Sequence, residues 1–97
     1  MKGIIWGATI ASAESKLEEI IQDYMMYKIS PFKRTRNEVL FNNGDLWKAV
    51  GAKEDARGQR CNISYIDTKI DSDFIETIIK PGTIAYPYHA FNFYNQE

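Results

Sequence analysis

Two short apolar runs, each followed by a helical pattern, constrain the fold of this chain more than any other feature. Residues 4–6 (Ile-Ile-Trp) lie between two glycines, and residues 61–66 form a second run that ends at Asp67. The first run does not alternate with polar residues, which is typical of a strand covered on both faces. The order of strand, helix, strand and helix predicts an α/β unit in which the two buried strands are parallel.

The first helical pattern is predicted to begin at an N-cap residue, Ser12, and to continue to Lys28. Its apolar positions follow the spacing of an amphipathic helix, and they are Ala13, Leu17, Ile20, Ile21, Tyr24 and Tyr27. Pro31 makes any further helical turn unfavourable. The second pattern has one apolar face made by Ile70, Phe74, Ile75, Ile78 and Ile79. It is predicted to stop at residues 80–82, Lys-Pro-Gly.

A β-hairpin is predicted between the two helices. Residues 38–41 and 46–50 are β-prone, and the four residues that join them include Asn43 and Gly44. Asn-Gly is a strong hairpin signal because both residues tolerate a positive φ. The hairpin should extend or flank the sheet that the parallel strands form.

The length of 97 residues allows one compact hydrophobic core. We therefore expect a single domain over residues 1–97. The expected fold class is a small two-layer or three-layer α/β unit with parallel central strands, a β-hairpin and two amphipathic helices.

Charge and cysteine content narrow the range of functions. Twelve basic and thirteen acidic residues nearly cancel, so no overall field would draw the chain to nucleic acid or to an anionic membrane. One cysteine, Cys61, and one histidine, His89, are too few for a zinc site. We expect Cys61 to be a buried thiol and His89 to be a packed or edge side chain. The short N-terminal apolar run fits neither a signal peptide nor a membrane span, so we expect a cytoplasmic protein without a cofactor.

Two groups of basic residues are candidate contacts for phosphate or nucleic acid. Lys33, Arg34 and Arg36 form the densest basic cluster, within residues 32–37, and Arg57 and Arg60 flank Gly58. The alternative for the first group is a solvated linker. The alternative for the second is ion pairing with Glu54 and Asp55, a common and weakly stabilising arrangement at protein surfaces.

The tail of the chain is rich in aromatic residues and is the candidate partner surface. Its aromatic residues are Tyr86, Tyr88, Phe91, Phe93 and Tyr94. A chain this short needs its aromatics for burial, so the tail is interpreted first as a terminal edge strand that closes the core. An exposed aromatic face for a partner is the alternative.

Residues 41–67 carry the most specific signal, with the sequence F-N-N-G-D-L-W-K-A-V-G-A-K-E-D-A-R-G-Q-R-C-N-I-S-Y-I-D. This segment resembles the stretch that leads into the Walker B strand of phage large-terminase ATPase domains, with its hairpin, R-G loop and apolar strand ending in an acid. The strand at residues 4–7 and the two helices resemble elements around that stretch, so the resemblance covers roughly three quarters of the chain.

Two departures from the family pattern bear on catalysis. The chain has no phosphate-binding loop of the form G-x-x-x-x-G-K-[S/T], and the position that carries it in terminases would fall before Met1. Asp67 matches the position associated with magnesium, but Thr68 replaces the acid that orients the attacking water. Asp67 is therefore a weak candidate for a metal contact, and a capping or turn aspartate is the alternative.

The resemblance and its departures together favour a non-catalytic protein that binds another protein. The expected partner is a phage or host protein, in genome packaging or in the inhibition of a host defence system, and pairing with a second copy is a further option. Two other functions stay open. One is an accessory protein that binds nucleic acid, and the other is a catalytic fragment completed in trans by a partner that carries the nucleotide loop.

Overall fold

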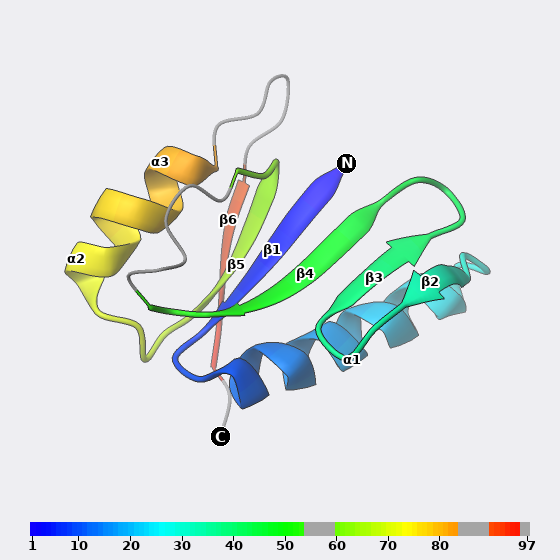
Figure 1. The fold of residues 1–97 in the computed structure, drawn as a ribbon, viewed down its shortest axis with the longest axis horizontal. Helices are drawn as coiled ribbons and strands as arrows, with labels where there is room; N and C mark the ends of the chain where they lie inside the picture. Colours follow the sequence, from blue (N-terminus) through cyan, green and yellow to red (C-terminus); the bar gives the residue numbers. More distant parts are fainter. Residues whose placement is uncertain (54–59, 84–89, 96–97) are drawn as a thin grey trace.

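The computed structural model describes residues 1–53, 60–83 and 90–95 and contains one mixed β-sheet (Figure 1). The sheet has six strands in the order β2-β3-β4-β1-β5-β6. In chain order the elements are β1 (Lys2–Gly7), α1 (Ile10–Met26), β2 (Pro31–Arg34), β3 (Glu38–Phe41), β4 (Leu46–Gly51), β5 (Ile63–Asp67), α2 (Ser72–Phe74), the π-helix η2 (Ile75–Ile79), α3 (Lys80–Gly82) and β6 (Ala90–Tyr94).

The centre of the sheet is parallel and one side of it is antiparallel. Strand β1 is central, and both of its neighbours, β4 and β5, run parallel to it. On one side β6 continues the parallel half beyond β5, and on the other side β3 and β2 are added as antiparallel strands. The α/β class and the parallel pairing of the two buried strands are confirmed, and the hairpin β3–β4 extends the sheet as expected.

The two faces of the sheet are covered by different helices. Successive residues of a strand point to opposite faces. In β1, Ile5 belongs to a core cluster with Leu17 of α1, whereas Ile4 and Trp6 belong to a cluster with Ile79 of the second helical segment. Helix α1 therefore covers one face and the α2–η2–α3 segment covers the other, which makes three layers (Figure 1).

Helix α1 begins three residues earlier than the sequence pattern predicts. Its N-cap is Thr9, whose hydroxyl oxygen accepts a hydrogen bond from the Ser12 N–H at 3.2 Å. The prediction of Ser12 as the N-cap was wrong because Ser12 already lies in the first turn and its hydroxyl has a distant partner. Ile10 obscured the start of the helix because this apolar residue is 44% exposed and is not part of the buried stripe.

The end of α1 also differs from the prediction. Ala13, Leu17, Ile20 and Ile21 are buried as expected, but Tyr27 is 80% exposed and follows the last helical residue, Met26. The Lys28 N–H donates to the Met25 carbonyl and the Ile29 N–H to the Tyr24 carbonyl, both at 3.0 Å. This is a Schellman ending, and it places Lys28 in the left-handed region with φ 63°. Tyr27 is turned out of the stripe because the helix stops before it.

Replacing Lys28 with glycine is expected to raise the free energy of unfolding by about 0.5 kcal/mol, because glycine adopts a positive φ without a Cβ clash. The gain is small since glycine also increases the conformational entropy of the unfolded chain. Urea unfolding of Lys28→Gly and Lys28→Ala checks this prediction. The alanine variant removes the same charge and keeps the strain, so a glycine variant no more stable than the alanine variant contradicts the explanation.

Residues 31–34 form a strand, in a region (residues 32–37) for which a solvated linker was one of the two interpretations. Strand β2 pairs with β3 through Lys33 opposite Leu40 and Arg34 opposite Val39, with an irregular register after Pro31. The interpretation as a linker was wrong because the pairing partner lies in the hairpin and the local composition gives no sign of it. The side chains of Phe32, Lys33 and Arg34 are nevertheless exposed.

The hairpin prediction is confirmed, with a detail that differs. The Phe41 N–H donates to the Asp45 carbonyl at 2.8 Å, and the Gly44 N–H donates to the Phe41 carbonyl at 3.0 Å. Three residues therefore form the loop, and of these only Gly44 has a positive φ, 95°. This arrangement is that of a type I turn followed by a glycine bulge.

The second helical segment continues through the predicted stop. The π-helix η2 precedes α3, which includes Pro81. A proline has no N–H to donate, so a stretch with an altered hydrogen-bond pattern accommodates it. The segment ends at Thr83, whose hydroxyl donates to the Ile79 carbonyl at 2.8 Å. Cys61 lies beside this end and is 3% exposed, which confirms that its thiol is buried.

Candidate functional site

The candidate site lies where the central strands end and the chain leaves the sheet in two directions. Strands β1 and β5 are parallel neighbours, so their carboxyl ends lie at the same edge. The helical segments that follow them cover opposite faces of the sheet. Such a switch point is where open α/β sheets place their ligand-binding groups. Asp67 is the last residue of β5 and lies at this edge, as expected from the sequence.

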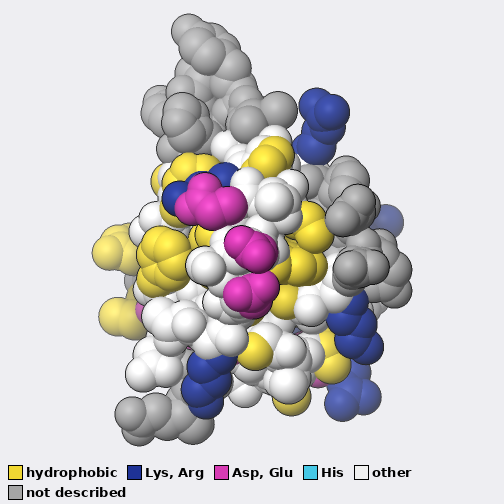
Figure 2. All heavy atoms as spheres, turned by 90° about the vertical axis from the view of Figure 1, so that its left-hand side faces the viewer, with side chains coloured by type: hydrophobic (Ala, Val, Ile, Leu, Met, Phe, Trp, Pro, Cys, Tyr) yellow, Lys and Arg dark blue, Asp and Glu magenta, His cyan; other side chains and the backbone are white. Residues whose placement is uncertain are grey.

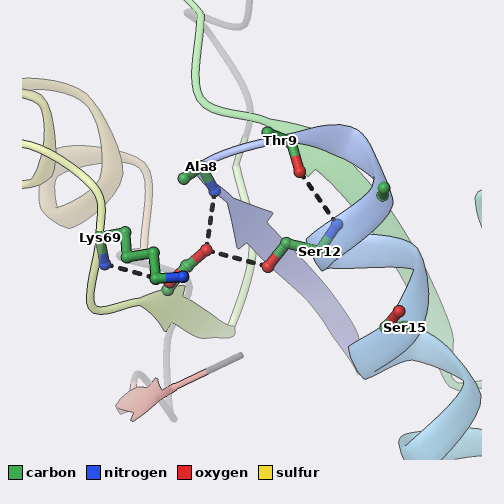
Figure 3. Close-up of a pocket in the computed structure, with 7 residues that line it drawn as sticks. Ala8, Thr9, Ser12, Ser15 and Lys69 are labelled. Atoms are coloured by element: carbon green, nitrogen blue, oxygen red, sulfur yellow. Dashed lines mark hydrogen bonds between the residues drawn. The ribbon is translucent and has the colours of Figure 1, made fainter. Parts of the chain in front are cut away.

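Asp67 connects three segments of the chain through its carboxylate. Its Oδ2 atom accepts hydrogen bonds from the Ala8 N–H at 3.0 Å and from the Ser12 hydroxyl at 2.9 Å. Its Oδ1 atom accepts from the Lys69 N–H at 3.0 Å. Figure 3 shows Ala8, Ser12 and Lys69 approaching this carboxylate from the end of β1, the first turn of α1 and the turn after β5.

The surroundings of Asp67 favour its charged form. Burial alone would raise the pKa of this carboxyl, which is 1% exposed. The N–H groups of Ala8 and Lys69, the Ser12 hydroxyl and the positive charge of Lys69 outweigh burial, so the pKa is lowered from its ordinary value of 3.8. Asp67 is therefore a buried carboxylate that is ionised at neutral pH.

The three hydrogen bonds bear on the second interpretation of Asp67, that of a capping or turn aspartate. Each donor belongs to a different segment, so the carboxylate holds together the end of β1, the start of α1 and the turn after β5. A turn or capping role is thus present in the structure. The metal contact stays a prediction, and in the described ranges no group of three His, Cys, Asp or Glu side chains is placed to hold a metal ion.

A shallow pocket of about 310 Å³ lies in front of this carboxylate. It is lined by Ala8, Thr9, Ala11, Ser12, Ser15, Asp67 and Lys69. Ser15 lies one helical turn beyond Ser12 on the same side of α1 (Figure 3). The small side chains leave room, and the hydroxyls and Lys69 provide polar groups. Asp67 already supplies the negative partner at this helix N-terminus, where a bound anion would otherwise be favoured.

Thr68 takes no part in this pocket, although the resemblance to terminases draws attention to it. Its N–H donates to the Tyr94 carbonyl at 3.0 Å, and its hydroxyl donates to the Asn95 side chain at 3.4 Å. Both contacts go to the end of β6. Thr68 thus connects the turn after β5 to the end of the last strand.

In the first group of predicted phosphate contacts, Arg34 and Arg36 face α1. Arg36 forms an ion pair with Glu14 at 3.0 Å, and Arg34 forms one with Glu18. The Lys33 ammonium lies 6.0 Å from the centre of the Phe32 ring. These three residues lie on and after β2, and three strands separate β2 from β5, whose last residue is Asp67. Because Arg34 and Arg36 form these ion pairs, they neutralise acidic side chains of α1.

The second group is only partly described. Arg60 is exposed and precedes Cys61 at the amino-terminal end of β5, so it lies at the opposite edge of the sheet from Asp67. Arg57, with Glu54 and Asp55, lies outside the described residues. The structure thus does not bring Arg60 together with Lys33, Arg34, Arg36 or the Asp67 pocket.

The predicted partner surface is divided between the core and the solvent. Tyr94 is 9% exposed and its hydroxyl donates to the Trp6 carbonyl at 3.1 Å, so it belongs to the core. Phe91 is partly buried against the cluster of the second helical segment, and Phe93 is 57% exposed. Tyr86, Tyr88 and His89 lie outside the described residues. The prediction of a terminal edge strand is confirmed by β6.

Sequence reasoning missed most of the pocket around Asp67. Ser12 was assigned to a helix cap, and Ala8, Thr9, Ser15 and Lys69 were not singled out. One signal was available in the sequence, because Thr9 is a preferred N-cap residue and lies shortly after a buried strand. The connection to Asp67 had no local signal, since Ser12 and Asp67 are 55 residues apart.

Neither of two comparisons with known proteins finds a relative of this chain. A scan against models of protein families finds no match, and a search of curated proteins finds none either. None of the described helices is both long enough and apolar enough to span a membrane.

Proposed function

We propose that this chain is a non-catalytic protein that binds another protein, and that the outer edge of β6 is its docking edge. The observation that carries the proposal is the exposure of Phe93 on the last strand of the parallel half of the sheet. Parallel strands are normally covered on both faces. The Phe93 ring is 57% exposed on such a strand, and aromatic side chains contribute strongly to the energetics of interfaces.

The orientation of the backbone N–H and carbonyl groups of β6 also supports docking at its outer edge. The Ala90 N–H donates to the Asn62 carbonyl, and the Tyr94 carbonyl accepts from the Thr68 N–H, so these two residues face β5. By alternation along the strand, the N–H and carbonyl of Phe93 are directed away from β5. A strand from a partner would meet these groups and the exposed ring together, as in β-strand addition.

The opposite edge of the sheet is built differently. Strand β2 contains Pro31, an irregular register and the charged residues Lys33 and Arg34. Proline, bulges and charges are the features that keep an edge strand from pairing with another chain. Strand β6 has the sequence Ala-Phe-Asn-Phe-Tyr, without a charge or a proline. The contrast favours β6 as the edge that receives a partner.

The nature of the partner is proposed from the resemblance in residues 41–67. A chain similar to part of a large-terminase ATPase domain, without a phosphate-binding loop, is suited to contacts in phage genome packaging or in the inhibition of a host defence system. Pairing of β6 with a second copy is a further form of the same proposal. A partner that carries the missing loop would instead make this chain part of a split enzyme.

Nucleic-acid binding is less favoured by the arrangement of charge. Arg34 and Arg36 are paired with glutamates of α1. Figure 2 shows acidic side chains gathered at the centre of the face that α2 and α3 cover. Asp71, Asp73 and Glu76 of that region are exposed. Glu76 is paired with Lys80 at 2.7 Å, whereas Asp71 and Asp73 leave negative charge on this face, which is unfavourable for phosphates.

Affinity purification of Phe93→Lys from phage-infected cells tests the proposal. A lysine at this position places a charge on the docking edge, so we expect the proteins recovered with the wild-type chain to be lost. Phe32→Lys is the matched control, because Phe32 is 63% exposed on the opposite edge strand. Mass spectrometry identifies the partner, and sedimentation velocity detects pairing with a second copy.

Both variants change exposed side chains. Their free energy of unfolding, measured by thermal unfolding, should therefore stay within about 0.5 kcal/mol of that of the wild type. Docking at β6 is contradicted if the wild type, Phe93→Lys and Phe32→Lys recover the same proteins. It is also contradicted if the wild-type chain is monomeric and recovers no specific protein. Recovery of a protein that carries a nucleotide-binding loop, lost only with Phe93→Lys, supports the edge and identifies the split enzyme.

A further inference from the structure

A second pocket lies at the other end of α1, away from Asp67 and β6. It has a volume of about 320 Å³ and is formed by the last turn of α1, the residues after it and the β3–β4 loop. Its lining residues are Asp23, Tyr24, Tyr27, Ile29, Asn43 and Asp45. Apolar and acidic groups thus share one concave surface that the proposed docking edge does not include.

The floor of this pocket is held by a chain of hydrogen bonds. The Trp47 indole N–H donates to the Tyr24 hydroxyl oxygen at 2.9 Å, and the Tyr24 hydroxyl donates to Asp45 Oδ2 at 2.7 Å. The Tyr24 ring is stacked on Phe41 with centroids 3.9 Å apart. Burial, with the neighbouring Asp45, raises the pKa of Tyr24 to about 12, so its hydroxyl remains a neutral donor. A ligand would therefore meet a floor that is already ordered, which lowers the entropic cost of binding.

The negative charge of Asp23 is not explained by the stability of the fold. Asp23 lies in the last turn of α1, where the helix carbonyls disfavour an acidic side chain and where the helix has no basic residue. Within residues 1–53, 60–83 and 90–95 no ion pair to Asp23 is found. Asp45 differs, because the amino group of Met1 lies 3.3 Å from its Oδ1 atom. A residue that opposes the local preference without a compensating contact is often functional.

The aromatic wall of the pocket complements this charge. Tyr27 is 80% exposed at the end of the helix, beside Ile29, which is packed against the core. A cation is attracted to the face of an aromatic ring and to a carboxylate, and a planar guanidinium satisfies both at once. Lysine, a compact and strongly hydrated ammonium, gains less from stacking on a ring.

We propose that this pocket binds the side chain of an arginine from a partner protein. The guanidinium pairs with Asp23 and stacks against Tyr27, while the methylene groups of the side chain contact Ile29 and the edge of Tyr24. The volume is sufficient for one long side chain and not for a folded element. The inference stands on this pocket alone and does not depend on docking at β6.

An NMR titration with the capped tripeptide acetyl-Gly-Arg-Gly-amide tests the site. We expect shifts of the backbone amides of Asp23, Tyr24, Tyr27, Ile29 and Asn43, with a Kd on the order of 1 mM, because one side chain supplies most of the contact. Asp23→Asn and Tyr27→Ala should each weaken binding about tenfold. Acetyl-Gly-Lys-Gly-amide should bind several times more weakly than the arginine peptide.

Met26→Ala is the matched control, since Met26 is also 80% exposed in the same turn but does not line the pocket. It should leave the affinity unchanged. The amide spectra of the three variants establish that each one is folded. An absence of shifts at about 10 mM peptide, or equal affinity of the wild type, Asp23→Asn and Tyr27→Ala, overturns the proposal. Equal binding of the lysine peptide overturns the assignment to arginine.

Discussion

A chain with Asp67→Ala is expected to lose about 3 kcal/mol or more of its free energy of unfolding, because three buried or partly buried donors lose their acceptor at once. The Ala8 N–H and the Ser12 hydroxyl lose the acceptor at Oδ2, the Lys69 N–H loses the acceptor at Oδ1, and methyl substitution adds a small cavity. Urea unfolding followed by circular dichroism at neutral pH measures the loss.

Asp67→Asn is the matched control for this prediction. Its amide oxygen still accepts from Ala8 and Ser12, but its amide nitrogen faces the Lys69 N–H, where two donors oppose each other. We expect a loss between those of the wild type and Asp67→Ala. Equal stability of the wild-type chain and Asp67→Ala would show that the network does not hold the fold together.

The same carboxylate predicts a pH dependence. The pKa of Asp67 is lower in the folded chain than its ordinary value of 3.8, so its contribution to stability is present above about that pH. The contribution is lost as the pH falls through the folded pKa, because the proton then binds to the folded state. The difference in stability between the wild type and Asp67→Asn should therefore shrink between pH 5 and the acid limit.

Gly7→Ala is the second substitution with a large expected effect. A Cβ atom at Gly7 would lie 2.3 Å from the Thr9 carbonyl oxygen and 2.6 Å from the Ala13 nitrogen. Both are backbone atoms, so relief requires the start of α1 to move away from the end of β1. This movement would also disturb the bond between Ala8 and Asp67. We expect a loss of about 3 kcal/mol, measured by urea unfolding.

Gly51→Ala is its control, because Gly51 of β4 is paired with Gly7 of β1 in the parallel register. The nearest heavy atom to a Cβ at Gly51 is the Ile10 nitrogen at 3.6 Å, an ordinary contact distance. We expect a change of no more than about 0.5 kcal/mol, with a slight gain because glycine is unfavourable inside a strand. Similar losses in both variants would refute the close approach of α1 to Gly7.

The parts of the fold that could be predicted depend on local patterns. The run at residues 4–6 indicated β1, and Gly44 between two β-prone segments indicated the hairpin. The stripe from Ala13 to Ile21 indicated the buried face of α1. In each of these elements, the side chains that decide the conformation are neighbours in the sequence, so their spacing alone carries the signal.

The candidate site was predicted only at its centre. Asp67 could be placed at the end of a buried strand, because a strand ending in an acid is a local feature. Its partners could not be predicted, because Ser12 lies 55 residues away and Ala8 contributes a backbone N–H that any residue but proline has. The pocket at the end of α1 was missed because the pattern placed Tyr27 in the core, whereas the helix ends before it.

The sequence by itself determined the α/β class, the parallel central strands, the hairpin, the buried thiol of Cys61 and the absence of the phosphate-binding motif within the 97 residues. Only the tertiary structure decided that residues 31–34 are an edge strand, that Ser12 bonds to Asp67, and that Arg34 and Arg36 pair with α1. These features arise from pairing and hydrogen bonding between distant segments. Their free energy exists only once the chain is compact, and for that reason no local pattern records them.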